Sequence, residues 1–296
     1  MYLKKLRKPR AGYVAIVGRT NAGKSTFLNA IMGAKIAIVS DKPQTTRRRI
    51  LGVHTTPAGQ IVFFDSPGIH QPHFRLNDRM MKDVRESLDD ADLILLFVEI
   101  DDRGKDEIVL SLLGGIKKPV FLVINKIDKR PKGEILPLIG FFKDLYPWKE
   151  IVPISAKTGE NLDTMEALIT QYLPIGDPFF PEEHLTDQSE RFYVAEMVRE
   201  KILARVREEL PFAITVRVTE MEDRGEYRAI RAEILVETPS QKKIMIGRRG
   251  SMLREVGEAA RLDLEDYLDR KVFLDLFVKV APNWRNENEV IQEIFE

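Results

Sequence analysis

The stretch at 13–25, YVAIVGRTNAGKS, contains residues whose types and spacing suit the binding of a polyphosphate. Two glycines bound a G-x-x-x-x-G-K-S loop ahead of an expected helix, and such a loop turns its backbone N–H groups onto phosphate oxygens. Lys24 would reach the β- and γ-phosphates, and the Ser25 hydroxyl would bind Mg²⁺. The pattern therefore predicts a nucleotide site rather than a simple glycine turn. The expected contacts are Gly18, Arg19, Thr20, Asn21, Ala22, Gly23, Lys24, Ser25 and Thr26.

A second polar group, D-S-P-G at 65–68, follows the apolar run IVFF. An aspartate at a strand end suits a Walker-B-type residue, which holds Mg²⁺ directly or through water. The glycine would then place a backbone N–H beside a γ-phosphate. Taken alone, this sequence is equally typical of a surface turn. The expected nucleotide contacts here are Asp65, Ser66, Pro67, Gly68 and Ile69.

A third group, N-K-I-D at 125–128, follows the apolar run VFLVI. A carboxylate accepts two hydrogen bonds from the N1–H and exocyclic amine of guanine, a pair that adenine lacks. Asp128 would therefore select guanine, while Asn125 braces the loop and the stem of Lys126 covers the base. A weaker signal after the run IVPI would bring a backbone N–H to the guanine O6. It consists of Ser155, Ala156 and Lys157.

The elements that must position these groups alternate along the first half of the chain. Expected strands lie at 12–17, 50–56, 60–64, 92–99, 119–125 and 151–155, and expected helices at 24–33, 75–90, 105–116, 133–146 and 161–173. This alternation predicts an α/β domain with a mainly parallel sheet flanked by helices. Ligands of such sheets bind beyond the carboxyl ends of the strands, where the polar groups are found.

The segment 40–49, SDKPQTTRRR, is polar, interrupted by proline and long enough to move, as a loop that senses a γ-phosphate must be. A threonine hydroxyl in it could complete the Mg²⁺ shell, and Thr46 is preferred to Thr45. The arginines at 47–49 could clamp phosphate or contact RNA, although such a run is more often a solvated surface.

In order and spacing, GRTNAGKS, QTTRR, DSPGI, NKID and SAK resemble the five G motifs of the TRAFAC class of P-loop GTPases. The resemblance implies GTP hydrolysis with Lys24, Thr46 and Gly68 at the reacting phosphate. Mg²⁺ would be held by Ser25, Thr46 and Asp65. Ile69 stands where Ras-like enzymes carry a water-orienting glutamine, so a slow intrinsic rate is expected. Asn21 matches an asparagine that binds K⁺ in several relatives, which makes K⁺ stimulation a hypothesis.

The second half has a different order of elements. A helix is expected at 188–210, strands at 213–222 and 227–237, helices at 240–246 and 251–268, and a strand at 272–280. With the G-R-R-G loop at 247–250, this order resembles an α+β type II KH domain, in which such a loop approaches a sugar–phosphate backbone. A helix–turn–helix connection without a ligand is the alternative. The expected RNA contacts are Lys242, Lys243, Ile244, Ile246, Gly247, Arg248, Arg249, Gly250 and Arg254.

Three prolines and a glycine at 173–181 are typical of an interdomain connector. We expect a flexible basic N-terminus at 1–10, a G domain at 11–174, a linker at 175–187, a KH domain at 188–281 and a helical tail at 282–296. Residues 1–180 hold 27 Lys and Arg against 21 Asp and Glu, whereas 181–296 hold 19 against 25. RNA binding by the acidic second half would therefore need a local basic patch.

Composition excludes several classes of protein. The 296 residues contain no cysteine, which rules out disulfides and cysteine-based zinc sites. The apolar runs are shorter than the roughly 20 residues of a membrane-spanning helix. The N-terminus, MYLKKLRKPR, is basic but leads into no apolar region, so it is not a secretory signal. It could instead be a solvated arm near RNA or an anionic membrane surface.

A G domain followed by a KH domain with the loop IGRRG resembles the Era family, bacterial GTPases of small-subunit ribosome assembly. The resemblance implies a cytoplasmic switch that binds single-stranded RNA near the 3′ end of 16S rRNA and assists 30S subunit assembly. GTP would favour the RNA-bound form, and hydrolysis would release it. Weak association with the inner face of the membrane is also implied, and no DNA partner. The alternative is a GTPase regulator whose second domain binds proteins or membranes.

Overall fold

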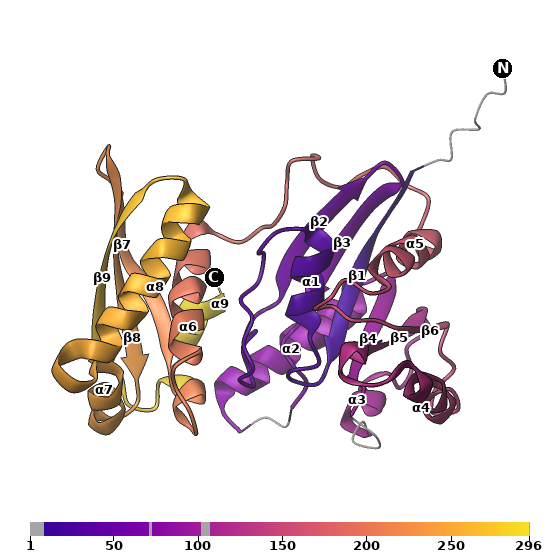
Figure 1. The fold of residues 1–296 in the computed structure, drawn as a ribbon, viewed down its shortest axis with the longest axis horizontal. Coiled ribbons are helices and arrows are strands. Elements are labelled where there is room, and N and C mark those ends of the chain that lie inside the picture. Colours follow the sequence, from indigo (N-terminus) through magenta and orange to yellow (C-terminus); the bar gives the residue numbers. More distant parts are fainter. Residues whose placement is uncertain (1–8, 71–72, 102–106, 296) are drawn as a thin grey trace. The chain divides into compact units, whose positions relative to one another are not determined.

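The computed structural model describes residues 9–70, 73–101 and 107–295. The chain divides into two compact units (Figure 1). The first comprises the described residues within 1–37, 46–71 and 79–187, and the second those within 38–45, 72–78 and 188–296. The expected basic N-terminus lies mostly at 1–8, outside the described residues, and Arg10 already begins the first strand. None of the described helices is both long enough and apolar enough to span a bilayer.

The first unit is built on a six-stranded sheet in the order β2-β3-β1-β4-β5-β6. Its strands are β1 Arg10–Gly18, β2 Ile50–Thr56, β3 Gly59–Asp65, β4 Leu93–Glu99, β5 Val120–Asn125 and β6 Glu150–Pro153. Only β2 runs antiparallel to its neighbour, because two residues connect it to β3 and a parallel crossover needs a much longer connection. All other pairs are parallel, so the predicted mainly parallel sheet is confirmed.

Helices cover both faces of this sheet, as Figure 1 shows. They are α1 Lys24–Met32, α2 Arg75–Asp90, α3 Glu107–Leu112, α4 Ile135–Phe142 and α5 Leu162–Tyr172. Along β1, Val14 and Ile16 join an apolar cluster that includes Phe27 of α1. The alternating Ala15 and Val17 join a second cluster with residues of α2 and α4. The period of two therefore places successive side chains of one strand in two separate cores.

The expected linker at 175–187 is fixed to the first unit by Gln60, a fully buried residue of β3. The Gln60 side-chain oxygen accepts the N–H groups of Phe179 and Phe180 at 2.8 and 3.0 Å. Its amide nitrogen donates to the Phe180 carbonyl at 2.8 Å and to Thr55 Oγ1 at 2.9 Å. One buried side chain thus satisfies three backbone groups of the segment.

Two further contacts extend this attachment. The Phe179 ring stacks on Tyr13 with centroids 4.8 Å apart, and Tyr13 stacks in turn on Phe64 at 5.2 Å. Further along, the Val53 N–H of the edge strand β2 donates to the Leu185 carbonyl at 2.9 Å. The segment from 174 to 185 is therefore a packed strap rather than a free connector.

The second unit contains a three-stranded sheet, β7-β8-β9, with helices packed on one face. Its elements are α6 Glu190–Leu203, β7 Thr215–Asp223, β8 Tyr227–Val236, α7 Pro239–Ile246, α8 Ser251–Leu268, β9 Lys271–Val280 and α9 Asn288–Phe295. Strand β8 is antiparallel to β7 and parallel to β9. The predicted element order is confirmed, but the first helix ends seven residues before the expected limit. A left-handed φ of 58° at Glu208, followed by Pro211, excludes a helix that runs on to residue 210.

The C-terminal tail and the outer strand β9 of this unit differ in burial. Trp284, in the turn before α9, is fully buried and donates its indole N–H to the Ala213 carbonyl at 2.9 Å, which ties the tail to the unit. At the edge strand β9, the side chains of Phe273 and Phe277 remain exposed by 61% and 47%.

Replacing Gln60 with Leu should destabilise the first unit by about 1–3 kcal/mol, because three partly buried backbone groups of the strap lose their partner. Urea unfolding would measure the loss, and limited proteolysis should show new cleavage within 174–185. Thr55→Val removes only the fourth bond and serves as the control, with an expected cost below about 1 kcal/mol. Unchanged stability and protease resistance of the Leu variant would show that the aromatic contacts and the Val53–Leu185 bond hold the strap without Gln60.

Candidate functional site

The phosphate-binding loop follows β1 and leads into α1, and its glycines lie too close to residues of β4 and β5 for any side chain. Gly18 has a φ of +147°, and a Cβ there would collide with the Phe97 carbonyl oxygen. Gly23 has a φ of +88°, and a Cβ there would collide with the side-chain amide of Asn125. Both conformations are open to glycine at little cost. Asn21 also adopts a left-handed φ of 63°.

Lys24 is buried within this loop, with 6% of its surface exposed. Its Nζ donates to the carbonyls of Gly18 and Arg19 at 3.1 and 2.8 Å. Burial lowers the pKa of Lys24 to about 8, although the nearby Asp65 opposes the shift. The ammonium group thus lies within the loop whose N–H groups are expected to receive phosphates.

Three side chains of the predicted metal site lie close together. Ser25 comes from α1, Thr46 from the segment before β2, and Asp65 from the end of β3. Ser25 Oγ donates to Asp65 Oδ2 at 2.5 Å and lies 2.9 Å from Thr46 Oγ1. The fully buried Asp65 keeps its Oδ1 without a hydrogen-bond partner among the described residues. Burial raises the pKa of Asp65 to about 6, against the opposing effects of Lys24 and the two hydroxyls. Hydroxyl and carboxylate oxygens of this kind fit a Mg²⁺ ion.

The structure places Thr46, and not Thr45, in this group. The Thr45 hydroxyl donates instead to the Lys42 carbonyl at 2.6 Å. The segment 65–69 also lies against the phosphate-binding loop, since the Ile69 N–H donates to the Gly18 carbonyl at 3.0 Å. A Cβ on Gly68 would lie 2.7 Å from the Cα of Thr20, so only glycine allows this approach.

Two neighbours of Gly68 serve the packing of this segment. The Ser66 hydroxyl donates to the Ile16 carbonyl at 2.7 Å. The Ile69 side chain is 5% exposed and belongs to the apolar cluster of Ala15 and Val17. It therefore points into the core and offers no polar atom to an attacking water.

Asn125 joins the base-recognition loop to two other loops. Its Nδ2 donates to the Ala22 carbonyl at 2.9 Å, and its Oδ1 accepts the Ala156 N–H at 3.0 Å. Asp128 is exposed, and its Oδ1 accepts the Ser155 hydroxyl at 2.6 Å. The three groups predicted after β1, β5 and β6 are thus brought together at one edge of the sheet. In the structure the Ala156 N–H is donated to Asn125, and the expected contact of a backbone N–H of residues 155–157 with the guanine O6 stays a prediction.

Sequence reasoning missed Glu99, the last residue of β4. It forms ion pairs with Lys126 at 2.8 Å and Lys129 at 2.6 Å. Partial burial would raise the pKa of Glu99, but the bonds from the two lysines outweigh it and the pKa is lowered. Its position at a strand end was the only available signal. Glu99 holds the ammonium group of Lys126, whose left-handed φ of 66° turns the loop.

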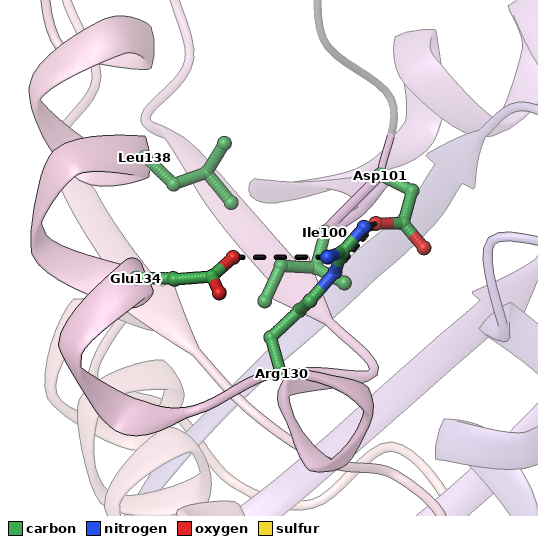
Figure 2. Close-up of a pocket in the computed structure, with 5 residues that line it drawn as sticks. All are labelled: Ile100, Asp101, Arg130, Glu134 and Leu138. Atoms are coloured by element: carbon green, nitrogen blue, oxygen red, sulfur yellow. Dashed lines mark hydrogen bonds and ion pairs between the residues drawn. The ribbon is translucent and has the colours of Figure 1, made fainter.

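Beside this loop lies a cavity of about 430 Å³ (Figure 2). Ile100 and Leu138 form its apolar floor, and Arg130 lies between two carboxylates at its rim. The Arg130 guanidinium is 2.6 Å from Asp101 and 3.8 Å from Glu134. Arg130 is the only cation among the described residues that line the cavity, and it is paired with both carboxylates.

The second unit presents the predicted G-R-R-G loop between α7 and α8. Gly247 and Gly250 have φ values of 75° and 77°, and Arg249 between them has a φ of 52°. A Cβ on Gly247 would lie 2.7 Å from the backbone nitrogen of Met252. The loop thus turns sharply, and α7 before it begins with a capping box formed by Thr238 and Gln241.

Five cations surround this loop, and none of them forms an ion pair with a carboxylate of the described chain. Other arginines of the unit are paired, such as Arg231 with Glu220 at 2.8 Å. The Ile244 side chain beside the cations is 56% exposed, whereas Ile246 is partly buried in the core. The acidic balance of this half is therefore offset by a local cationic surface. The five cations are Lys242, Lys243, Arg248, Arg249 and Arg254.

Comparison with known proteins gives the same division. A family model described as 50S ribosome-binding GTPase matches residues 13–126, and a KH domain model matches residues 209–285. GTPase Era of Geobacter metallireducens is 46% identical, with 96% of this chain and 97% of the relative covered. GTPase Era of Lacticaseibacillus paracasei is also 46% identical, with 96% of each chain covered.

Two solved structures are similar over nearly their whole length. One is Era in complex with MgGDPNP and nucleotides 1506–1542 of 16S ribosomal RNA. Its TM-score is 0.94 at 43% identity, covering 97% of this chain and 98% of that one. The other is an Aquifex aeolicus Era variant bound to GDP·AlF4⁻, with a TM-score of 0.93 at 42% identity and coverage of 96% and 98%.

The exposed carboxylate of Asp128 gives a test of base recognition. Asp128→Asn should weaken GTP binding by at least about 100-fold, because an amide cannot accept both hydrogen bonds from guanine. The same variant should gain affinity for XTP, whose base offers a carbonyl in place of the exocyclic amine. Fluorescent-nucleotide titrations would measure both, with Asp163→Asn on α5 as a control of equal charge. An unchanged preference for GTP would show that another group selects the base.

Proposed function

The chain belongs to the Era family and is a P-loop GTPase with a C-terminal KH domain, and on that premise we propose its cellular task. It is a GTP-hydrolysing switch that binds single-stranded RNA near the 3′ end of 16S rRNA and assists 30S subunit assembly. The observation that carries the RNA part is the cluster of five cations around the G-R-R-G loop, which have no carboxylate partners among the described residues. The complex of the similar Era protein with nucleotides 1506–1542 supports the choice of RNA.

The reaction is transfer of the terminal phosphoryl group of GTP to water. Mg²⁺, when bound, neutralises charge on the β- and γ-phosphates, and Ser25, Thr46 and Asp65 are the residues that would hold it. Lys24 and the loop N–H groups stabilise the charge that develops on the phosphate oxygens. The Gly68 N–H would face the γ-phosphate, and Asp128 would select the base.

Turnover without a partner should be slow. The Ile69 side chain lies in the core, and no residue of the described site is an obvious general base. Catalysis would then rest on positioning and on neutralisation of charge. A slow intrinsic rate suits a switch, since the bound state persists until a partner triggers hydrolysis.

RNA would approach the loop at 247–250 as a single strand. Two glycines bring the backbone close to the sugar–phosphate chain, and the surrounding cations contact phosphates. Ile244 offers an exposed apolar surface to an unstacked base. GTP favours the RNA-bound form and hydrolysis releases it. A cytoplasmic location suits this task, whereas the basic segment expected to contact membranes lies mostly outside the described residues.

Changing Arg248 and Arg249 together to Glu should weaken binding of a short RNA matching the 16S 3′ end by about 100-fold or more at moderate salt. Any stimulation of GTP hydrolysis by that RNA should disappear, while basal hydrolysis stays at the wild-type rate. Arg261→Glu on α8 is the control, because its side chain pairs with Glu265 at 3.0 Å, away from the loop. This pair of variants is preferable to changes at Gly247, where any side chain would strain the fold.

Wild-type affinity of the double variant would contradict the RNA proposal. If wild-type protein hydrolyses GTP but binds neither this RNA nor an unrelated one, the second unit serves as a protein-interaction module instead. In that case the GTPase assignment is unaffected.

We also propose that K⁺ stimulates hydrolysis through Asn21. The exposed position of Asn21 in the phosphate-binding loop and its left-handed backbone support this proposal, since an exposed side-chain oxygen there would be open to a cation beside the phosphates. GTPase rates in matched KCl and NaCl buffers should differ severalfold for the wild type, and Asn21→Ala should remove the difference. Equal rates in the two salts would eliminate this role.

A further inference from the structure

Arg199 of α6 is a charged residue in an unusual place, with only 1% of its surface exposed. Its Nε and Nη2 form a two-pronged ion pair with the Glu196 carboxylate, at 2.6 Å each. The remaining Nη1 is buried and has no hydrogen-bond partner among the described residues. Burying such a pair costs desolvation energy, and apolar residues of similar size often stabilise a fold better. Stability alone therefore gives a weak reason for this pair.

A second bond of the same guanidinium suggests what it does. Nη2 also donates to the backbone carbonyl of Thr45, within the second unit. Segment 38–45 of that unit is attached to α6 at two more points. Ile38 is buried in an apolar cluster with Tyr193 and neighbouring residues of α6. The Val39 N–H donates to Glu200 Oε1 at 3.0 Å.

The Thr45 carbonyl belongs to the peptide group that links Thr45 to Thr46. Because a peptide group is planar, a bond that fixes its oxygen also fixes the direction of the Thr46 N–H and restricts the Thr46 Cα. Thr46 carries the hydroxyl that lies 2.9 Å from Ser25 Oγ in the predicted metal site. The chain thus runs directly from the residue held by Arg199 to a residue expected to bind Mg²⁺.

We propose that Arg199 is a positioning residue for GTP hydrolysis, which sets the place of the Thr46 hydroxyl by holding the Thr45 carbonyl. Glu196 in turn holds the guanidinium in the required orientation. The inference rests on the proposed function, because it concerns the same reaction. It adds a residue far along the sequence, on the first helix of the second unit, to the set on which turnover depends.

The test uses the full-length chain with two variants, Arg199→Met and the double variant Glu196→Met with Arg199→Met. The single variant should lower kcat for GTP by about tenfold, with KM for GTP changed less than about twofold, since the groups that bind the nucleotide are untouched. It should also raise the Mg²⁺ concentration needed for half-maximal rate. The single variant leaves Glu196 buried without its partner, so its stability will fall as well.

The double variant separates positioning from stability, because it removes both charges. It should recover stability in urea unfolding while kcat stays low and the Mg²⁺ requirement stays high. Arg205→Met, just beyond the end of α6, removes an arginine whose guanidinium is 3.7 Å from Glu255 and should leave both parameters unchanged.

Recovery of kcat together with stability in the double variant would show that Arg199 is only part of a structural ion pair. A wild-type kcat in the single variant would overturn the inference as well. The wild-type assay distinguishes failure of this inference from failure of the proposed function. If the wild type hydrolyses GTP and the Arg199 variant does so equally well, only the positioning role is overturned and the GTPase function is retained. A wild-type protein that hydrolyses no GTP would overturn both.

Discussion

The side-chain amide of Asn125 is the contact on which the nucleotide site most depends. It is buried, and it joins the loop after β1 to the loop after β6 through one donor and one acceptor bond. Gly23 makes this contact possible, because the Cβ of any larger residue would collide with the Asn125 amide. The three loops therefore hold a fixed spacing before a nucleotide arrives, and the cost of ordering them is met during folding rather than on binding.

Burial also explains the electrostatic state of the site. The pKa of Lys24 is lowered to about 8 and that of Asp65 is raised to about 6, in both cases chiefly because burial disfavours the charged form. A nucleotide phosphate would bring negative charge to the lysine, and a divalent cation would bring positive charge to the aspartate. Lys24 and Asp65 are thus poorly solvated in the protein, and the phosphate and the divalent cation would supply the opposite charges that compensate for this burial.

The fold and most of the site could be predicted because their signals are local. Gly18, Lys24 and Asp128 lie in motifs of fixed spacing, and the strands around them are nearly continuous apolar runs. Gln60 and Arg199 carry no such signal, because each is a single polar residue whose bond to a distant backbone carbonyl spans 120 and 154 positions, respectively. The sequence likewise did not predict that residues 38–45 belong to the second unit, because this depends on long-range packing. Local patterns predict elements and loops, whereas these contacts arise only from the tertiary arrangement.

The exposed edge of the second sheet has a consequence for the behaviour of the protein at high concentration. Within the described part of the chain, β9 is an outer strand of its sheet and carries the exposed rings of Phe273 and Phe277, a combination that invites edge-to-edge aggregation. Charged residues interrupt the same strand on both sides of the rings. They act as gatekeepers, since a second strand that paired here would have to desolvate them. These gatekeepers are Lys271, Asp275 and Lys279. The colloidal stability of the chain thus depends on three side chains that take no part in binding or hydrolysis.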